Sequence, residues 1–211
     1  RDDYSTITNA YPDHEDVQGP AGYDVAQVIS EFIPPHGRLF TTEDQMLPIL
    51  KEMAKSKNTS IRAIGERESM LIGDDVLARF PYHEHPKNIA LVSALAQALS
   101  VPAAVALAEM ADNVVPDLGV LKTYPRVAHA GRTVAFTNGM SANERTGALG
   151  NWTRMSFDQH DVDREPSRWI ITVVNNRADR VARSEVFARF VVQDIGAHKH
   201  FLIGTNVSGL V

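Results

Sequence analysis

The sequence predicts an α/β fold in which the strands of a parallel sheet are covered by helices. Strand-like runs alternate with amphipathic helical stretches along the chain, which is the pattern of such a fold. Of the 211 residues, 44% are hydrophobic and 22% are charged, as in ordinary soluble globular proteins. Residues 114–126 combine prolines and a glycine with little periodicity, so they are a candidate linker. We therefore expect two domains, residues 1–125 and residues 126–211.

The first expected domain alternates strands with helices. The expected strands are residues 4–9, 38–42 and 59–64, and the expected helices are residues 23–32, 43–56, 85–99 and 102–113. In the first of these helices, Val25, Ile29 and Phe32 are spaced for one buried face. Ala, Leu and Val dominate the last two helices, so we expect both to pack on several sides.

The same alternation continues in the second expected domain. Its expected strands are residues 133–137, 169–174 and 200–203, and its expected helices are residues 142–155 and 184–195. His198 and His200 would lie on one face of the last strand, where we expect a structural role.

Charge and cysteine content exclude several classes of function. The 21 basic and 26 acidic residues form no overall basic surface for sequence-independent binding, so nucleic acid is not an expected partner. The absence of cysteine excludes disulfides, thiolate metal sites and a cysteine nucleophile. No apolar run approaches the roughly 18 residues that cross a bilayer. The chain begins at Arg1 and enters a strand almost at once, so we expect it to be a piece of a longer protein.

The loop after the first strand is the first candidate for a functional site. In open α/β sheets, ligands bind beyond the carboxyl ends of the strands. This loop contains Asp13, His14 and Asp16. Carboxylates with one imidazole suit Mg²⁺ or Mn²⁺ at a phosphate site. An ordinary polar surface loop explains the same residues.

A second candidate loop covers residues 136–144. Gly139 permits a tight turn there, and Asn143 is a polar residue suited to begin the following helix. A plain strand-to-helix turn is the alternative interpretation.

A third candidate loop covers residues 174–180, which follow an apolar strand. Arg177 and Arg180 are suited to bidentate contacts with carboxylate or phosphate. An internal ion pair with Asp179 is an equally good explanation of these residues.

Common catalytic motifs are absent from the sequence. It contains no Gly-x-Ser-x-Gly, no Gly-x-Gly-x-x-Gly, and no Gly-x-x-x-x-Gly-Lys-Ser/Thr phosphate loop, because no glycine is followed by lysine. His83, Glu84 and His85 lack the i, i+4 spacing of a zinc helix, so we interpret them as a solvated turn.

Taken in order, several segments resemble the poly-γ-glutamate synthase ligase subunit, a capsule-biosynthesis branch of the Mur ligase superfamily. Residues 9–19 resemble the family's motif Asn-Val-x-x-Asp-His-x-Asp-x-x-Gly, and residues 86–91 resemble its adenine-side Asn helix. Residues 136–152 resemble the stretch that contains Asn-Gly-x-x-Ala-Asn-Asp, and residues 176–181 resemble Asn-x-Arg-Ala-Asp-Arg-Val. Residues 201–204 resemble the strand that follows. The resemblance implies a Mur-ligase-like parallel-sheet fold. Residues 1–125 would be the second half of the central ATP-binding domain, and residues 126–211 a truncated Rossmann-like C-terminal domain.

The resemblance implies that ATP and Mg²⁺ bind to this family fold. His14 would help to hold Mg²⁺ near the γ-phosphate, with Asp13 and Asp16 in the same loop. Asn88 would contact adenine, and Asn138 occupies the place of an Asp that touches the ribose in other Mur ligases.

Further residues are expected in the nucleotide site and in catalysis. Asn143 belongs to the Asn-Gly-x-x-Ala-Asn stretch and is grouped with the nucleotide-binding residues. Lys122 falls where the family usually has an Arg near the phosphates. From their charge, we expect Arg177, Asp179 and Arg180 to position a carboxylate-rich acceptor.

The implied activity is the ATP-dependent formation of γ-glutamyl amide bonds through an acyl phosphate. Its substrates would be glutamate or a poly-γ-glutamate chain, and its partners the other subunits of a membrane-bound polymer synthase at the cytoplasmic face of the membrane. Because the family's phosphate loop lies N-terminal to this region, we expect the chain alone to be inactive. Two alternatives are a non-catalytic scaffold subunit of a capsule-synthesis complex and a metal-dependent hydrolase built on Asp13, His14 and Asp16.

Overall fold

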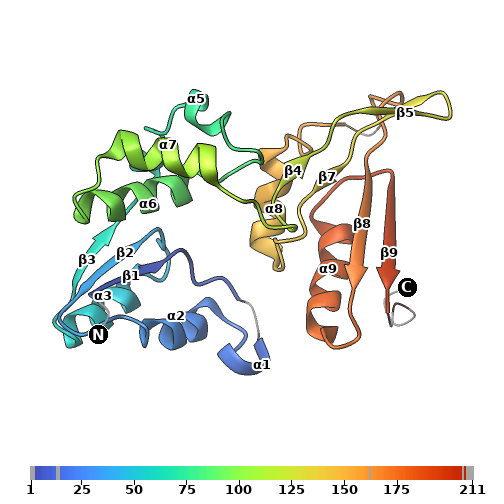
Figure 1. Cartoon of the computed structure of the whole chain (residues 1–211). Coiled ribbons are helices and arrows are strands. Elements are labelled where there is room, and N and C mark those ends of the chain that lie inside the picture. Colours follow the sequence, from blue (N-terminus) through green and yellow to red (C-terminus); the bar gives the residue numbers. More distant parts are fainter. Residues whose placement is uncertain (1–2, 13–14, 162, 206, 208–211) are drawn as a thin grey trace. The chain divides into compact units, whose positions relative to one another are not determined.

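The computed structural model describes residues 3–12, 15–161, 163–205 and 207 (Figure 1). The chain divides into two compact units, residues 1–138 and residues 139–211. The predicted domains, residues 1–125 and 126–211, stay a prediction, because compactness alone does not show where an independently folding domain ends.

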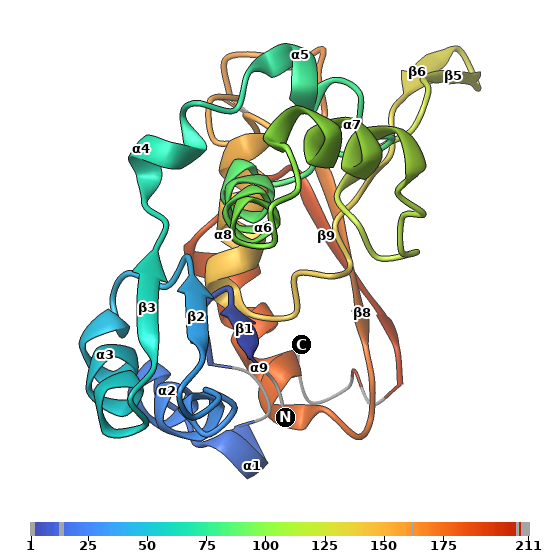
Figure 2. The same ribbon diagram turned by 60° about the vertical axis from the view of Figure 1, so that its left-hand side comes forward.

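The first unit is built on a parallel sheet in the order β1-β2-β3 (Figure 2). The strands are β1 (Tyr4–Ile7), β2 (Arg38–Thr41) and β3 (Ser60–Ala63). In the register of the sheet, Tyr4 lies opposite Arg38, which lies opposite Ser60. The structure therefore confirms the expected strands of this unit and their parallel arrangement.

Helices α2 (Gly22–Ser30) and α3 (Leu47–Ser56) pack against one face of this sheet. Leu39 of β2 and Leu50 of α3 are fully buried between them. The prediction for Phe32 was wrong, because its side chain is 77% exposed. The helix ends at Ser30, so the helical period no longer sets the direction of Phe32. Helix α3 also begins later than the predicted residue 43.

Helix α6 (Pro86–Ala98) covers the other face of the sheet, and α7 (Ala103–Asn113) packs on α6 (Figure 1). Phe40, the neighbour of Leu39 on β2, is buried with Ala90 and Leu91 of α6. Successive residues of β2 are therefore buried on opposite faces, as in the interior strands of parallel sheets. The short helices α1 (Glu15–Gln18), α4 (Glu66–Ser69) and α5 (Asp74–Leu77) were not predicted.

The end of the first unit contains antiparallel pairs. Strand β4 (Lys122–Thr123) pairs with β7 (Thr137–Asn138), and β5 (Val127–His129) forms a hairpin with β6 (Arg132–Val134). The single predicted strand at residues 133–137 is thus divided between two pairs, neither of them parallel. A two-residue turn, such as the one between β5 and β6, can join only antiparallel strands, because parallel strands need a much longer crossover connection.

The second unit contains α8 (Arg145–Arg154), β8 (Ile171–Asn176), α9 (Val181–Gln193) and β9 (Lys199–Gly204). Strands β8 and β9 are parallel. Val174 of β8 packs with Phe190 and Val191 of α9, and α8 contributes Leu149 and Trp152 to the same cluster. The other face of the pair leaves apolar side chains exposed, namely Ile171, Val173, Phe201 and Ile203.

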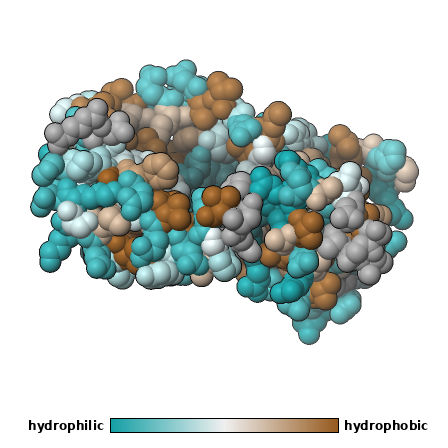
Figure 3. All heavy atoms as spheres, turned by 90° about the horizontal axis from the view of Figure 1, so that it is seen from below, coloured by the Kyte–Doolittle hydropathy of each residue, from teal (hydrophilic) through white to brown (hydrophobic). Residues whose placement is uncertain are grey.

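The described chain is a mixed α/β protein, as predicted. Figure 3 shows hydrophobic side chains among hydrophilic ones on the face that it displays. Among the helices that the structure describes, none has the length and hydropathy needed to cross a membrane.

Candidate functional site

The carboxyl ends of β1, β2 and β3 lie at one edge of the first unit's sheet. Ile7, Thr41 and Ala63 are the last residues of these strands and face one another in the register. The loops that follow therefore leave the sheet side by side, which is where open α/β folds bind ligands. We call this region the carboxyl edge.

A buried glutamate that the sequence analysis missed organises the carboxyl edge. Glu43 is 5% exposed, and each carboxylate oxygen accepts a backbone hydrogen bond. Oε2 accepts from the N–H of Ala10 at 2.6 Å, and Oε1 accepts from the N–H of Met46 at 2.8 Å. The side chain thereby joins the loop after β1 to the start of α3. An acidic residue at the start of the predicted helix, residues 43–56, was the available signal in the sequence.

Lys87 connects three segments of the same edge. Its Nζ lies 3.7 Å from Asp44 Oδ2, in the loop after β2, and 3.5 Å from Glu66 Oε2, in α4. The Lys87 side chain is 27% exposed, whereas both carboxylates are largely in solvent. Such pairs position the start of α6 more than they stabilise the fold.

Asn88, predicted to contact adenine, is exposed on the first turn of α6. Its Nδ2 donates to Glu84 Oε1 at 3.0 Å, and the N–H of His85 donates to the same oxygen at 2.7 Å. The other oxygen, Oε2, accepts from the Tyr82 hydroxyl at 2.6 Å. Because a carboxylate can only accept, this arrangement fixes which end of the Asn88 amide faces Glu84. Glu84 is thus an organising residue rather than part of a merely solvated turn.

Burial and the neighbouring Glu84 carboxylate raise the pKa of Tyr82 well above its usual value. The phenol therefore remains a hydrogen-bond donor across the physiological range. A pocket of about 320 Å³ lies beside it, between α6, α7 and the preceding loop. Phe80, Met110 and Val114 give this pocket apolar walls, and Asn88 lines it as well.

Lys122 and Asn138 are brought together by the β4-β7 pair, where they lie directly opposite each other. Asn138 is buried, and its Nδ2 donates to the carbonyl of Leu118 at 2.7 Å. The Lys122 ammonium lies 5.6 Å from the centroid of the Tyr124 ring, within the range of a cation–π contact.

Asn143 does not begin helix α8, contrary to the sequence prediction. The N-cap residue is Glu144, whose side chain accepts from the N–H groups of Thr146 and Gly147. A carboxylate at this position also interacts favourably with the helix dipole, which favours Glu144 over Asn143 as the N-cap residue. Asn143 itself is exposed.

The second unit brings Arg177, Asp179 and Arg180 together at the carboxyl end of β8. Arg177 donates to both oxygens of Asp179, at 3.0 and 2.7 Å, and Arg180 Nε lies 4.0 Å from Asp179 Oδ2. The hydrogen bond from Arg177 lowers the pKa of Asp179 below its usual value. The ion pair considered from the sequence is therefore present, and it leaves these groups largely in solvent.

The loops after β8 and β9 are joined close to these arginines. Thr205 Oγ1 accepts from the N–H of Ala178 at 2.9 Å, and the N–H of Thr205 donates to the carbonyl of Asn176 at 3.0 Å. Gly204 has φ +98°, and a Cβ there would lie 2.0 Å from that carbonyl oxygen. Only glycine permits this approach.

Of the predicted metal ligands, Asp13 and His14 lie outside the described residues, and Asp16 falls in α1. Among the side chains that the structure does describe, no group of three or more His, Asp or Glu could hold a metal ion. The predicted nucleotide and catalytic residues are divided between the units. Asn88, Lys122 and Asn138 belong to the first unit, and Asn143, Arg177, Asp179 and Arg180 belong to the second.

Solved structures of folylpolyglutamate synthases share this fold. The enzyme from Thermotoga maritima matches 99% of the chain and 50% of its own length, with a TM-score of 0.57 and 15% identity. FolC of E. coli, solved with DHPP and ADP, matches 99% of the chain and 59% of its own length, with a TM-score of 0.56 and 12% identity. At these identities the likeness concerns the fold, which is Mur-ligase-like.

Sequence comparison identifies closer relatives. The chain is 32% identical to PGA synthase CapB of Bacillus subtilis over 97% of its length, and 34% identical to the capsule biosynthesis protein CapB of Bacillus anthracis over 96%. It spans 50% and 41% of these two proteins, about half or less of each. Residues 123–211 match the family model of the poly-gamma-glutamate synthase CapB C-terminal domain. Residues 123–211 therefore belong to the family of poly-gamma-glutamate synthase CapB C-terminal domains, and the chain is similar to CapB proteins along nearly its whole length.

Proposed function

We propose that this chain is part of an ATP-dependent ligase that joins glutamate residues through γ-amide bonds in poly-γ-glutamate synthesis. The observation that carries the proposal is the relationship to CapB proteins along nearly the whole chain. The fold shared with folylpolyglutamate synthases supports it.

The proposed reaction has two steps. The bond between the γ-phosphorus of ATP and its bridging oxygen breaks, a carboxylate oxygen of the glutamyl donor bonds to that phosphorus, and ADP leaves. The amine of the acceptor then attacks the acyl carbon, loses a proton and expels inorganic phosphate. Both steps gather negative charge, so the protein must supply cations and hydrogen-bond donors and must exclude water.

In the first unit, Asn88 would present its amide to adenine, with Glu84 and Tyr82 holding that amide in one orientation. The pocket beside Asn88 has the apolar walls that a purine ring requires. Lys122 would lie near the phosphates, and Asn138 would contact the ribose. In this arrangement Glu43 would fix the carboxyl edge, from which the predicted metal-binding loop leaves the sheet.

In the second unit, the guanidinium groups of Arg177 and Arg180 would hold carboxylates of the acceptor, with Asp179 keeping both arginines in place. Asn143 would also take part in binding the nucleotide. The glycine at position 204 supports this loop through its close approach to Asn176.

Asp13, His14 and Asp16 would hold Mg²⁺. Carboxylates with an imidazole form a donor set suited to this ion, and their loop leaves the sheet at the carboxyl edge, where Glu43 anchors Ala10. When bound, the ion would neutralise charge on the transferred phosphoryl group.

The substrates would be glutamate or a growing poly-γ-glutamate chain. Other subunits of a membrane-bound polymer synthase would be the partners, at the cytoplasmic face of the membrane. Since the chain spans half or less of its CapB relatives, we expect the 211 residues alone to release no ADP.

Glutamate-dependent ADP release tests the proposal, measured on the 211-residue chain and on the longest natural polypeptide that contains it. We expect turnover only in the longer protein. There, Asn88→Ala should raise KM for ATP about tenfold with little change in kcat, because one or two hydrogen bonds to the bound nucleotide are lost.

Asn151→Ala, which removes an amide from α8 outside the predicted set, is the matched control. No glutamate-dependent turnover and no nucleotide binding in the longer protein would contradict the ligase proposal. That outcome would favour the non-catalytic scaffold.

A further inference from the structure

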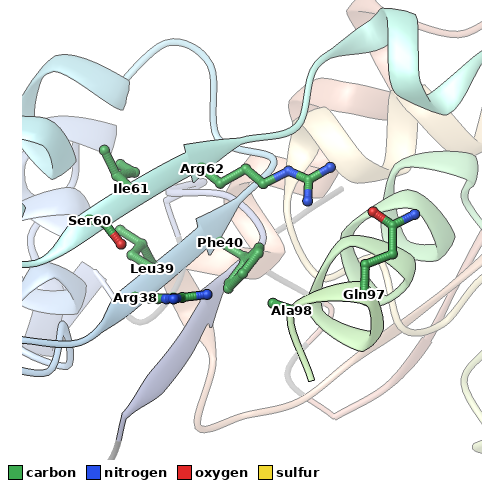
Figure 4. A pocket seen from close by; sticks show the side chains of 8 residues that line it. All are labelled: Arg38, Leu39, Phe40, Ser60, Ile61, Arg62, Gln97 and Ala98. Carbon is green, nitrogen blue, oxygen red and sulfur yellow. The ribbon is translucent and has the colours of Figure 1, made fainter. Parts of the chain in front are cut away.

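A second pocket lies on the first unit's sheet, away from the carboxyl edge. It has a volume of about 390 Å³ and lies between the start of β2 and β3 and the last turn of α6 (Figure 4). Arg38 and Ser60 are the first residues of their strands, whereas the candidate site follows the last ones. A strand of four residues spans about 13 Å, so the two regions are separate.

Two arginines line this pocket from the same face of the sheet. Arg38 lies opposite Ser60, and Arg62 lies two residues further along β3, opposite Phe40. Because alternate residues of a strand share a face, all four side chains project toward α6. Figure 4 shows Arg62 and Gln97 of α6 extending toward each other, with Phe40 and Ala98 between the two elements.

Neither arginine of the pocket has an acidic partner within the part of the chain that the structure describes. Arg79, Arg145 and Arg177, by contrast, each pair with a carboxylate. Arg38 instead lies over the Tyr4 ring, 6.0 Å from its centroid. Two guanidinium groups that line the same pocket would favour the binding of an anion there.

The rest of the lining indicates which anion would fit. Ala98, together with the small accessible edge of the buried Phe40, provides an apolar floor. Ser60 and Gln97 add a hydroxyl and an amide at the rim. Guanidinium forks match carboxylates, and an apolar floor accommodates methylene groups. A compact inorganic anion would use the cations but not the floor.

We propose that this pocket binds the γ-glutamyl chain itself, with Arg38 and Arg62 contacting successive carboxylates and the chain's methylene groups resting on Ala98 and the edge of Phe40. The inference rests on the proposed function, because that function makes such a chain the substrate. A γ-linked polymer carries one carboxylate per residue on a flexible backbone, so neighbouring carboxylates can reach both guanidinium groups. The protein's net charge of -5 disfavours nonspecific attraction of a polyanion, so binding would require a local basic site.

The test is fluorescence anisotropy of a labelled γ-linked pentaglutamate titrated with the 211-residue chain in the absence of nucleotide. We expect saturable binding that weakens about tenfold in Arg38→Gln and in Arg62→Gln, and about a hundredfold in the double variant. Arg67→Gln is the matched control, because Arg67 is an exposed arginine of α4 that does not line the pocket. It should bind like the unsubstituted chain.

Two further measurements separate recognition from folding and from simple charge. The variants Arg38→Lys and Arg62→Lys keep the charge without the planar fork, so their binding should be intermediate, with thermal midpoints unchanged. Unlabelled pentaglutamate should displace the probe at a much lower concentration than inorganic triphosphate does.

Three outcomes would overturn the inference: no binding by the unsubstituted chain, equal weakening by Arg67→Gln, or equally effective displacement by triphosphate. Since no nucleotide is used, polymer binding without ADP release in the longer protein would count against the ligase and not against the pocket. ADP release that depends on Asn88, without polymer binding, would count against the pocket and not against the ligase.

Discussion

Glu43 is the residue on which the geometry of the carboxyl edge depends most. Its carboxylate is buried and accepts from the N–H groups of Ala10 and Met46, which lie 36 residues apart in the sequence. Hydrogen bonds to an ionised acceptor are stronger than neutral ones, and unsatisfied buried donors are costly. The loop that carries the predicted metal ligands is thereby attached to the same anchor as α3.

Replacement of Glu43 should therefore destabilise the first unit. We expect Glu43→Ala to lower the free energy of unfolding by about 2–4 kcal/mol, because the buried N–H of Ala10 and the partly buried N–H of Met46 both lose their acceptor. Glu43→Gln should cost less, since its amide oxygen still accepts one of the bonds. Urea unfolding followed by circular dichroism measures both.

Asp44→Asn is the comparison variant, because the neighbouring side chain is 74% exposed and its ion pair with Lys87 is long. Its unfolding free energy should change by less than about 0.5 kcal/mol. Equal effects of the substitutions at positions 43 and 44 would show that Glu43 is not an anchor.

At the scale of elements, the β5-β6 hairpin shows how local backbone chemistry sets the pairing. Its two-residue loop is Ala130-Gly131, with φ values of 47° and 73°. Positive φ at both positions is typical of a type I′ turn, which matches the twist of antiparallel strands. Alanine is a poor residue for the first position, because its Cβ crowds the backbone in the left-handed region.

Substitutions in this turn should act in opposite directions. Ala130→Asn or Ala130→Gly should stabilise the hairpin by about 0.5–1 kcal/mol, since both residues tolerate positive φ. Gly131→Ala should destabilise it by about 1 kcal/mol. No atom lies within 4 Å of the Cβ position at Gly131, so that cost would come from the backbone alone.

Amide hydrogen exchange at His129 and Arg132, which face each other across the turn, measures these effects. Slower exchange in the Ala130 variants and faster exchange in Gly131→Ala are expected. Equal protection of these amides from exchange in all variants would show that the hairpin does not require a type I′ turn.

At the scale of the whole molecule, each compact unit has its own core and its own spectroscopic reporters. The clusters around Leu39, Phe40 and Ile89 belong to the first unit, and the cluster around Phe190 belongs to the second. The only two tryptophans of the sequence, at positions 152 and 169, lie in the second unit. Tryptophan fluorescence therefore follows the second unit separately.

Acid should destabilise the second unit through Asp194. Its side chain is 12% exposed, and Arg145 Nε donates to Oδ2 at 2.7 Å, joining α8 to the end of α9. This hydrogen bond lowers the pKa of Asp194 below its usual value. The stabilisation is thus complete above the unfolded pKa of about 4 and is lost as the pH falls through the lower folded value.

We expect the urea midpoint of the tryptophan signal to fall as the pH is lowered below about 4. Asp194→Asn should lower that midpoint at pH 7 and flatten its decline in acid, whereas Asp158→Asn, at an exposed position, should do neither. Parallel acid curves for the unsubstituted chain and Asp194→Asn would show that this pair does not stabilise the unit.

Local sequence determined the regular elements. The alternation of strands and helices, the strands around Leu39 and Ile61, and helices α6 and α7 follow from hydrophobic periodicity and from Pro at helix starts. These signals arise from neighbouring residues, so they can be recognised without the tertiary structure. The family motifs are similarly local, and they carried the resemblance to CapB.

Tertiary structure alone decided the contacts between distant segments. Phe32 is exposed because the helix ends before it. Glu43 is buried where its carboxylate accepts a hydrogen bond from the N–H of Ala10, a distant residue in the sequence. The pairing of β4 with β7, and the shared pocket of Arg38 and Arg62, likewise depend on register and packing. The sequence by itself thus determined which elements form and which family the chain resembles. Only folding brought together the side chains of each candidate site, because contacts across long sequence separations leave no periodic signal in either segment.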